Sequence, residues 1–217
     1  DVNGVITATG GNSDQWNIAY GWGNHADAGY LTTAWSLTGN SGTDPSLNFI
    51  GTTDDQPLKF RVHDLPAGEM NESNANTSFG FSSLLSNTTG YNNTAVGNRA
   101  LYHNTTGMLN SAIGSDALLY NTTGEANTAS GRSALNFNTT GSLNSAFGTN
   151  ALYANTTGFM NNAFGERALH NNTGGNMNIA IGNYALYDNT TGDYNTGIGI
   201  EALRSNTTGS KNTAFGF

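Results

Sequence analysis

A unit of seventeen residues recurs along most of the chain, and this repeat constrains the fold more than any other feature. The stretch NTTGYNNTAVGNRALYH at residues 87–103 is followed at once by NTTGMLNSAIGSDALLY at residues 104–120. The consensus N-T-T-G-x-x-N-x-A-h-G-x-x-A-L-x-x, where h is apolar, continues to residue 217, and a degenerate copy covers residues 70–86. Residues 70–217 therefore hold roughly nine units, and a repeat this strict reports architecture rather than catalysis, because each unit meets its neighbours in the same way.

The length of the unit selects the class of fold. Seventeen extended residues reach at most about 56 Å, which is enough for one closed coil with two short strands and two corners. Helical repeat units need about 33 residues or more, and glycines at the fourth and eleventh positions would interrupt a helix. The sequence therefore predicts an all-β fold for residues 70–217, a parallel β-solenoid or β-roll with one coil per unit.

Strand alternation assigns side chains to the two sides of each coil. Within NTAVG, Asn93, Ala95 and Gly97 face one way and the two residues between them face the other. We expect an apolar column and a leucine column to form two buried seams, and a small column to pack closely against another backbone. The apolar column is Phe79, Val96, Ile113, Ser130, Phe147, Phe164, Ile181, Ile198 and Phe215. The leucine column is Leu84, Leu101, Leu118, Leu135, Leu152, Leu169, Leu186 and Leu203. The small column is Ser78, Ala95, Ala112, Ala129, Ala146, Ala163, Ala180, Gly197 and Ala214.

Asparagine recurs without exception at the seventh position of the unit. At the ~4.8 Å spacing of stacked strands, these amides can hydrogen-bond from coil to coil as a ladder. In the NTTG corner, the asparagine side chain is expected to cap a turn and the glycine to supply a positive φ. The inner asparagine column is Asn76, Asn93, Asn110, Asn127, Asn144, Asn161, Asn178, Asn195 and Asn212.

The core that one chain can build from this unit is thin. One leucine, one apolar residue and two alanines bury only about 4–6 kcal/mol of side chain per coil, against the ordering entropy of seventeen residues. A lone chain is therefore under-supported, which favours several chains sharing a core.

The first 69 residues differ from the repeat in composition. They contain all three prolines and all three tryptophans (Trp16, Trp22 and Trp35) and eight acidic against two basic side chains. We expect a small N-terminal mixed, β-rich domain or fibre connector at residues 1–69 and the solenoid at residues 70–217. Ser13 or Asp14 can cap a short helix, and the segments LNFIG (47–51) and LKFRV (58–62) are typical of strands joined by the turn TTDDQP. The aromatic residues here indicate a small core rather than a sugar-stacking platform.

Charge and cysteine content exclude several classes of function. A net charge of -8 repels nucleic acid and anionic membranes, and no cysteine is available for disulfides or thiolate metal sites. No apolar run approaches the ~20 residues of a membrane-spanning helix, so membrane insertion is not expected.

The repeated polar residues carry three candidate chemistries, none of them strong. The NTTG asparagines are glycosylation sequons, but sugars on successive coils would collide, so wholesale modification is not expected. The unbroken column of second-position threonines raises ice binding as a lesser alternative. The carboxylates are scattered, except for Asp54 and Asp55 in an expected turn, and the histidines (His25, His63, His103 and His170) are spread too widely for a metal site. We assign no catalytic, cofactor-binding or metal-binding residues, and the chain is not expected to be an enzyme. The sequons lie at Asn87, Asn104, Asn121, Asn138, Asn155, Asn189 and Asn206.

The repeat resembles two groups of known proteins. The segment NTAVGNRAL is similar to the shorter repeats of trimeric autotransporter adhesin heads, which form left-handed parallel β-rolls assembled as homotrimers. The seventeen-residue unit, together with GGNSDQWNIAYGWGNHADAGYL and NFIGTTDDQPLKFRV, resembles bacterial and phage tail-fibre-domain proteins, in which such stretches often precede an endosialidase-type intramolecular chaperone domain. These resemblances imply a homotrimeric, left-handed coil in an extended fibre outside the cell or on a virion.

These observations together predict a structural or adhesive component of an extracellular trimeric fibre, either a tail fibre or a surface adhesin. Its partners would be further copies of itself and a surface glycan or receptor. A polysaccharide-degrading trimeric tail spike is the alternative, and it requires two carboxylates set across a groove between chains.

Overall fold

A computed structural model describes residues 41–44 and 49–216. The chain divides into two units, residues 1–51 and residues 52–217. In the first unit, the described residues 41–44 and 49–51 form bends and irregular chain, so the predicted strand at 47–51 is not seen over residues 49–51. The predicted helix after Ser13 or Asp14 and the three tryptophans lie outside the described residues.

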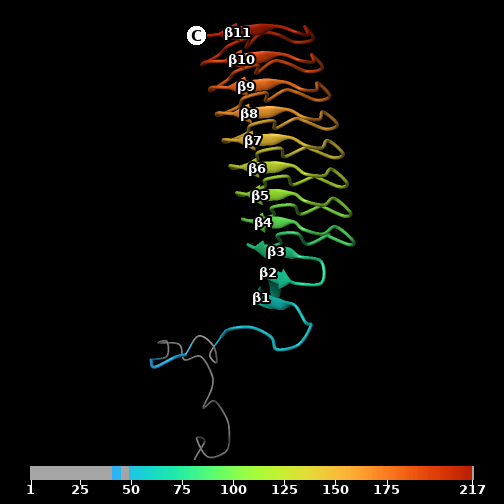
Figure 1. The fold of residues 1–217 in the computed structure, drawn as a ribbon, viewed down its shortest axis with the longest axis vertical. Coiled ribbons are helices and arrows are strands. Elements are labelled where there is room, and N and C mark those ends of the chain that lie inside the picture. Colours follow the sequence, from blue (N-terminus) through green and yellow to red (C-terminus); the bar gives the residue numbers. More distant parts are fainter. Residues whose placement is uncertain (1–40, 45–48, 217) are drawn as a thin grey trace, which may run out of the picture. The chain divides into compact units, whose positions relative to one another are not determined.

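The second unit is one sheet with its strands in chain order, from β1 to β11 (Figure 1). The sheet starts with a hairpin of β1 (Leu58–Val62), which confirms the predicted strand there, and β2 (Leu65–Asn71). The two hairpin-turn residues, His63 and Asp64, both have positive φ, as a tight two-residue turn requires. β2 then pairs antiparallel with β3 (Asn76–Phe79), so the hairpin covers the first edge of the parallel stack.

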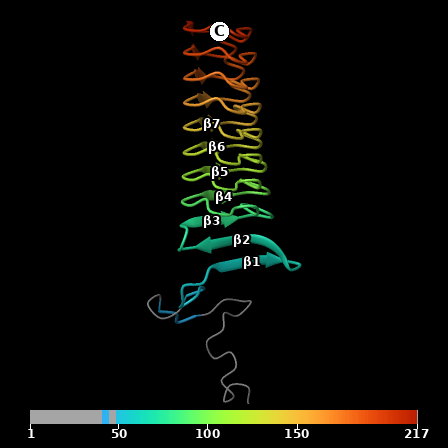
Figure 2. The same ribbon diagram turned by 90° about the vertical axis from the view of Figure 1, so that its right-hand side faces the viewer.

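From β3 onward the sheet is parallel, and each strand comes from the next coil (Figure 2). Ala95 lies beside Ala112, and Ala112 beside Ala129, so like residues stand over like at intervals of one repeat. No helix occurs in the described part of the chain, and the predicted parallel β-solenoid is confirmed. The strands are β4 (Thr94–Val96), β5 (Ser111–Ile113), β6 (Thr128–Ser130), β7 (Ser145–Phe147), β8 (Asn162–Phe164), β9 (Ile179–Ile181), β10 (Thr196–Ile198) and β11 (Thr213–Phe215).

Each coil has one short strand rather than the two that we expected. The second wall of the coil is a run of turns, because residues such as Arg99 and Leu101 adopt the left-handed conformation and bend the chain. Backbone hydrogen bonds still join this wall to the next coil, as from Leu101 N to the Ala117 carbonyl at 3.0 Å.

The core of the solenoid is made of small residues and leucine. From Leu101 to Leu186 the leucine column has no exposed surface, and the alanines of the small column from Ala95 to Ala180 are likewise buried, as predicted. The apolar column is not buried within the chain, and this expectation was wrong. Successive residues of a strand face opposite sides of the sheet, so only one of the two columns can face the interior. The interior of the coil is narrow and takes the alanine, and the neighbouring apolar residue therefore faces outward.

The two glycines of the unit have different roles. The glycine after each strand, such as Gly97 at φ 130°, has the positive φ that we had assigned to the NTTG corner. The corner glycine, such as Gly107, has no positive φ; a Cβ there would collide with the Gly124 carbonyl oxygen and with Oδ1 of Asn104. Close approach of the next coil, rather than backbone conformation, therefore requires glycine in the corner.

Candidate functional site

Two columns of asparagine side chains hold the coils in register from inside. In the inner column, Asn144 Nδ2 donates to Asn127 Oδ1 at 3.1 Å and to the Gly158 carbonyl at 2.8 Å. The same side chain accepts from the backbone N–H of Asn161 at 3.0 Å. This is the predicted ladder, and it ties each coil to the next through amides that are buried from Asn76 to Asn195.

The corner asparagines form a second ladder that sequence reasoning did not predict. Asn138 Nδ2 caps its own turn by donating to the Gly141 carbonyl, as expected, and it also donates to Asn121 Oδ1 at 2.7 Å. Both hydrogens of the amide are therefore used in a buried environment. The invariance of the corner asparagine was the signal for this second role, since a simple turn cap tolerates other residues.

This ladder bears directly on the glycosylation sequons. Asn104, Asn121, Asn138, Asn155 and Asn189 have no exposed surface, and a glycan on Nδ2 would remove hydrogen bonds on which two coils depend. The asparagines are structural, and the folded solenoid does not present them for modification.

The threonine column is also used inside the stack. Thr105 Oγ1 donates to the Thr122 carbonyl at 3.0 Å, and Thr122 Oγ1 donates to the Thr139 carbonyl at the same distance. The hydroxyl protons of this column are directed to the next coil, so they do not form the free, flat array that ice binding requires.

The outer face of the parallel strands is uncharged and consists of an apolar column beside a column of mostly hydroxyl-bearing residues. Seven residues of the apolar column are exposed along it, from 37% at Val96 to 74% at Phe215, and Ser130 and Ile198 are half-buried. The rings of Phe147 and Phe164 stack at 4.9 Å. Strand alternation places a second column beside it, formed by Thr77, Thr94, Ser111, Thr128, Ser145, Asn162, Ile179, Thr196 and Thr213. Neither column contains a charged residue over nine strands, a span of about 38 Å at the ~4.8 Å strand spacing.

Aromatic rings form a separate column along the turn wall. His103, Tyr120 and Phe137 stack with near-parallel planes at 5.0 and 5.2 Å between centroids. After an edge contact at 5.1 Å between Phe137 and Tyr153, the stack continues through His170 to Tyr187. Most ring faces are covered by neighbouring rings, so the column stabilises the stack and offers few free faces for sugar stacking.

Among the residues that the structure describes, the titratable side chains are not brought together into a reactive cluster. Asp54 and Asp55 lie in an exposed bend, Asp116 pairs with Arg99 at 2.8 Å, and Glu201 pairs with Arg204 at 2.6 Å. His63 lies in the hairpin turn and His25 lies outside the described residues. Over residues 41–44 and 49–216, no three histidine, aspartate or glutamate residues are grouped in a way that could hold a metal ion.

Comparison of the chain with models of known protein families, with curated proteins and with solved structures finds no match. The described residues contain no helix that is long and apolar enough to cross a bilayer.

Proposed function

We propose that the chain is a structural and adhesive component of an extracellular fibre, in which three copies assemble through the outer face of their parallel strands. The observation that carries this proposal is the exposed apolar column on a rigid stack of identical coils. A regular stack of this kind serves reach and display rather than catalysis.

Two properties of the outer face support self-association. An apolar column that recurs on eight of nine adjacent strands, with only Ser130 interrupting it, is unusual on the surface of a monomer and typical of interaction sites. The absence of charge also matches the centre of protein interfaces, where charged residues are depleted. Self-association further compensates for the thin core of each coil, because the apolar column then contributes to a shared one.

Light scattering of the purified chain tests the assembly directly. We expect a mass of three chains for the wild type, and a single chain for the double variant Phe147→Ser, Phe164→Ser. Serine is already present in this column at Ser130, so the variant should keep the coil intact. A monodisperse wild-type monomer would overturn the proposed assembly, and electron microscopy of the source cells or virions with a labelled antibody tests the extracellular location.

A further inference from the structure

A pocket lies at the N-terminal end of the solenoid, between the β1–β2 hairpin and the first coil. The hairpin extends the sheet wall beyond β3, whereas the turn wall of the stack begins only after it (Figure 1). The end of the stack is therefore covered on one side and open on the other. The space is about 390 Å³, within the usual range for small-molecule sites, and its lining includes Lys59, Glu69, Asn71, Asn76, Asn87 and Thr88.

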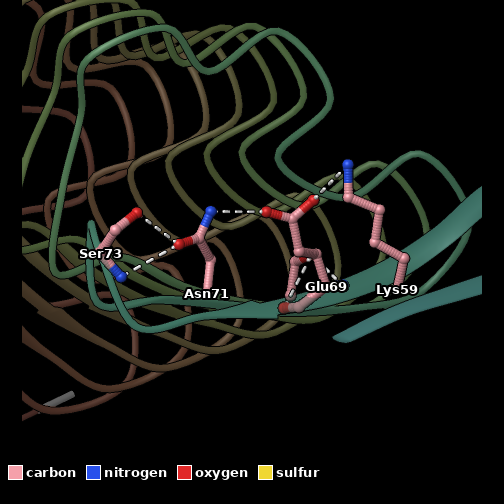
Figure 3. Close-up of polar contacts among 5 residues, drawn as sticks. Lys59, Glu69, Asn71 and Ser73 are labelled. Carbon is pink, nitrogen blue, oxygen red and sulfur yellow. Dashed lines mark hydrogen bonds and ion pairs between the residues drawn. The ribbon is translucent and has the colours of Figure 1, made fainter. Parts of the chain in front are cut away.

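The hairpin presents polar side chains to this end, where the later coils present alanine. Glu69 lies beside Ser78 in the sheet, whereas Ser78 on its other side lies beside Ala95. Figure 3 shows a row in which Lys59 Nζ lies 3.7 Å from Glu69 Oε2 and Asn71 Nδ2 donates to Glu69 Oε1 at 2.9 Å. Ser73 in turn holds the Asn71 amide by donating to its Oδ1 at 2.8 Å. The side chains of Glu69 and Asn71 are thus fixed in place over the pocket.

The floor of the pocket contains backbone acceptors that the stack does not use. In the next coil, the carbonyls of Ala100, Tyr102 and Thr105 accept hydrogen bonds from the coil before them. Their counterparts at the end of the stack are the carbonyls of Ser83, Leu85 and Thr88. These three residues line the pocket, and their carbonyls have no donor among the described residues.

Two asparagine side chains of the floor have unused donors. Asn104 Nδ2 donates both to the Gly107 carbonyl and to Asn87 Oδ1, whereas Asn87 Nδ2 donates only to the Gly90 carbonyl. Asn76 is 5% exposed, and its Nδ2 also has a single partner, the Gly90 carbonyl at 2.8 Å. Each therefore retains one N–H for a ligand.

This mixture of groups selects one class of ligand. The carboxylate of Glu69 and three open carbonyls disfavour an anion. Phe60, Leu84 and Leu85 also line the pocket, so the site suits a ligand that combines polar groups with an apolar face. Arg61 does not change this balance, because its guanidinium is paired with Asp64 at 2.9 Å. Sugar hydroxyls both donate and accept, so they suit a site where acceptors and amide donors alternate at close range.

We propose that this end pocket binds a neutral saccharide unit, with Glu69 and the open carbonyls accepting from its hydroxyls and Asn76 and Asn87 donating to them. The proposal deepens the attachment role proposed above, on which it rests, by placing glycan recognition at the end of the shaft rather than along the aromatic column.

Saturation-transfer NMR with glucose, galactose, mannose and N-acetylglucosamine, followed by titration, tests the pocket. We expect at least one sugar to bind with a Kd of about 1 mM, and the variants Glu69→Ala and Asn71→Ala to weaken binding at least about tenfold. The matched controls are Glu72→Ala and Asn98→Ala, which replace the same residue types at exposed positions outside the pocket and should leave binding unchanged.

Glu69→Gln separates a loss of binding from a loss of folding, because it preserves the shape of the side chain and its hydrogen bond with Asn71. We expect this variant to bind sugar more weakly and to unfold at the same thermal midpoint as the wild type. Absence of binding by all four sugars, or equal binding by the pocket variants, would overturn the proposal. Light scattering on the same samples separates the two ideas. A trimer that binds no sugar overturns only the pocket, and a monomer with pocket-dependent binding overturns only the trimeric assembly.

Discussion

At the scale of single residues, the coil combines backbone strain with buried contacts that outweigh it. Leu101 adopts φ 52°, and Leu118 adopts φ 50°, a conformation that costs non-glycine residues about 1–2 kcal/mol. Both leucines are fully buried, and burial of a leucine side chain contributes about 1.5–3 kcal/mol. The strain is thus tolerated where the side chain fills the core.

Replacement by glycine should relieve backbone strain at a residue that has a positive φ but contributes little to the core. Ala126 is only half-buried and has φ 54°, so Ala126→Gly should raise the free energy of unfolding by about 0.5–1 kcal/mol, because strain relief exceeds the added entropy of the unfolded chain. The same change at the buried strand residue Ala129 should lower it by about 1 kcal/mol. Urea denaturation of the two variants measures both effects, and a loss of stability in Ala126→Gly would contradict this account.

The asparagine ladder provides a second prediction at this scale. Asn144→Ala removes a fully buried amide and leaves the backbone N–H of Asn161 and one hydrogen of Asn161 Nδ2 without their acceptor, while the Gly158 carbonyl keeps only Asn155 Nδ2 as a donor. We expect a loss of about 3 kcal/mol or more, since each unsatisfied buried group costs about 1–3 kcal/mol. Ser142→Ala, two residues away, removes an exposed acceptor for Glu125 N and a weak, exposed hydrogen bond to the Thr140 carbonyl, and should cost less than about 1 kcal/mol. Thermal unfolding compares the two, and equal midpoints would show that the ladder contributes nothing special.

At the scale of elements, the coil is the unit that repeats, because each coil contacts its neighbours through the same strand register and the same two ladders. The free energy of unfolding of such a stack is close to the sum of the intrinsic stability of each coil and the interaction energy between neighbouring coils. Whole coils should therefore be removable, whereas parts of coils should not.

Deletion of residues 138–154, one complete unit, should leave a folded protein in which Asn121 meets Asn155. Deletion of residues 138–153 removes one residue fewer than a full unit. The next coil is then shifted by one residue, so its leucine and asparagine side chains no longer lie beside their counterparts. Circular dichroism and thermal unfolding should show a cooperative transition close to wild type for the first variant and a large loss for the second. Similar stability of the two deletion variants would show that the fold does not depend on the seventeen-residue register of the coils.

Much of the coil could be predicted from the repeat, because unit length, the leucine column and the inner asparagines each follow from stacking like over like. The orientation of the apolar column could not, because both sides of the strand bear apolar residues and only the narrow interior decides that Ala95 rather than Val96 is buried. The aromatic column was also missed, since it moves from the seventeenth position at Phe137 to the sixteenth at Tyr153. The end pocket depends on pairing between β2 and β3, which no local pattern specifies.

At the scale of the whole molecule, charge and apolar surface are separated. The chain has a net charge of -8, yet the outer face of β3–β11 contains no charged side chain. An uncharged face of this kind is what the proposed trimer requires, because charged residues are depleted at the centre of protein interfaces.

The proposed trimeric assembly through this face would make stability depend on protein concentration. For three chains that fold and assemble together, a tenfold rise in concentration adds about 1 kcal/mol per chain, which should raise Tm by about 2–4 °C. In Phe147→Ser, Phe164→Ser, the apolar column is interrupted at its centre, so Tm should become independent of concentration. Phe81→Ser removes a ring of similar exposure that follows strand β3 and belongs to neither column of the outer face, and it should retain the wild-type slope. Calorimetry over a hundredfold range of concentration distinguishes these cases, and a flat wild-type Tm would mean that the apolar column does not join chains.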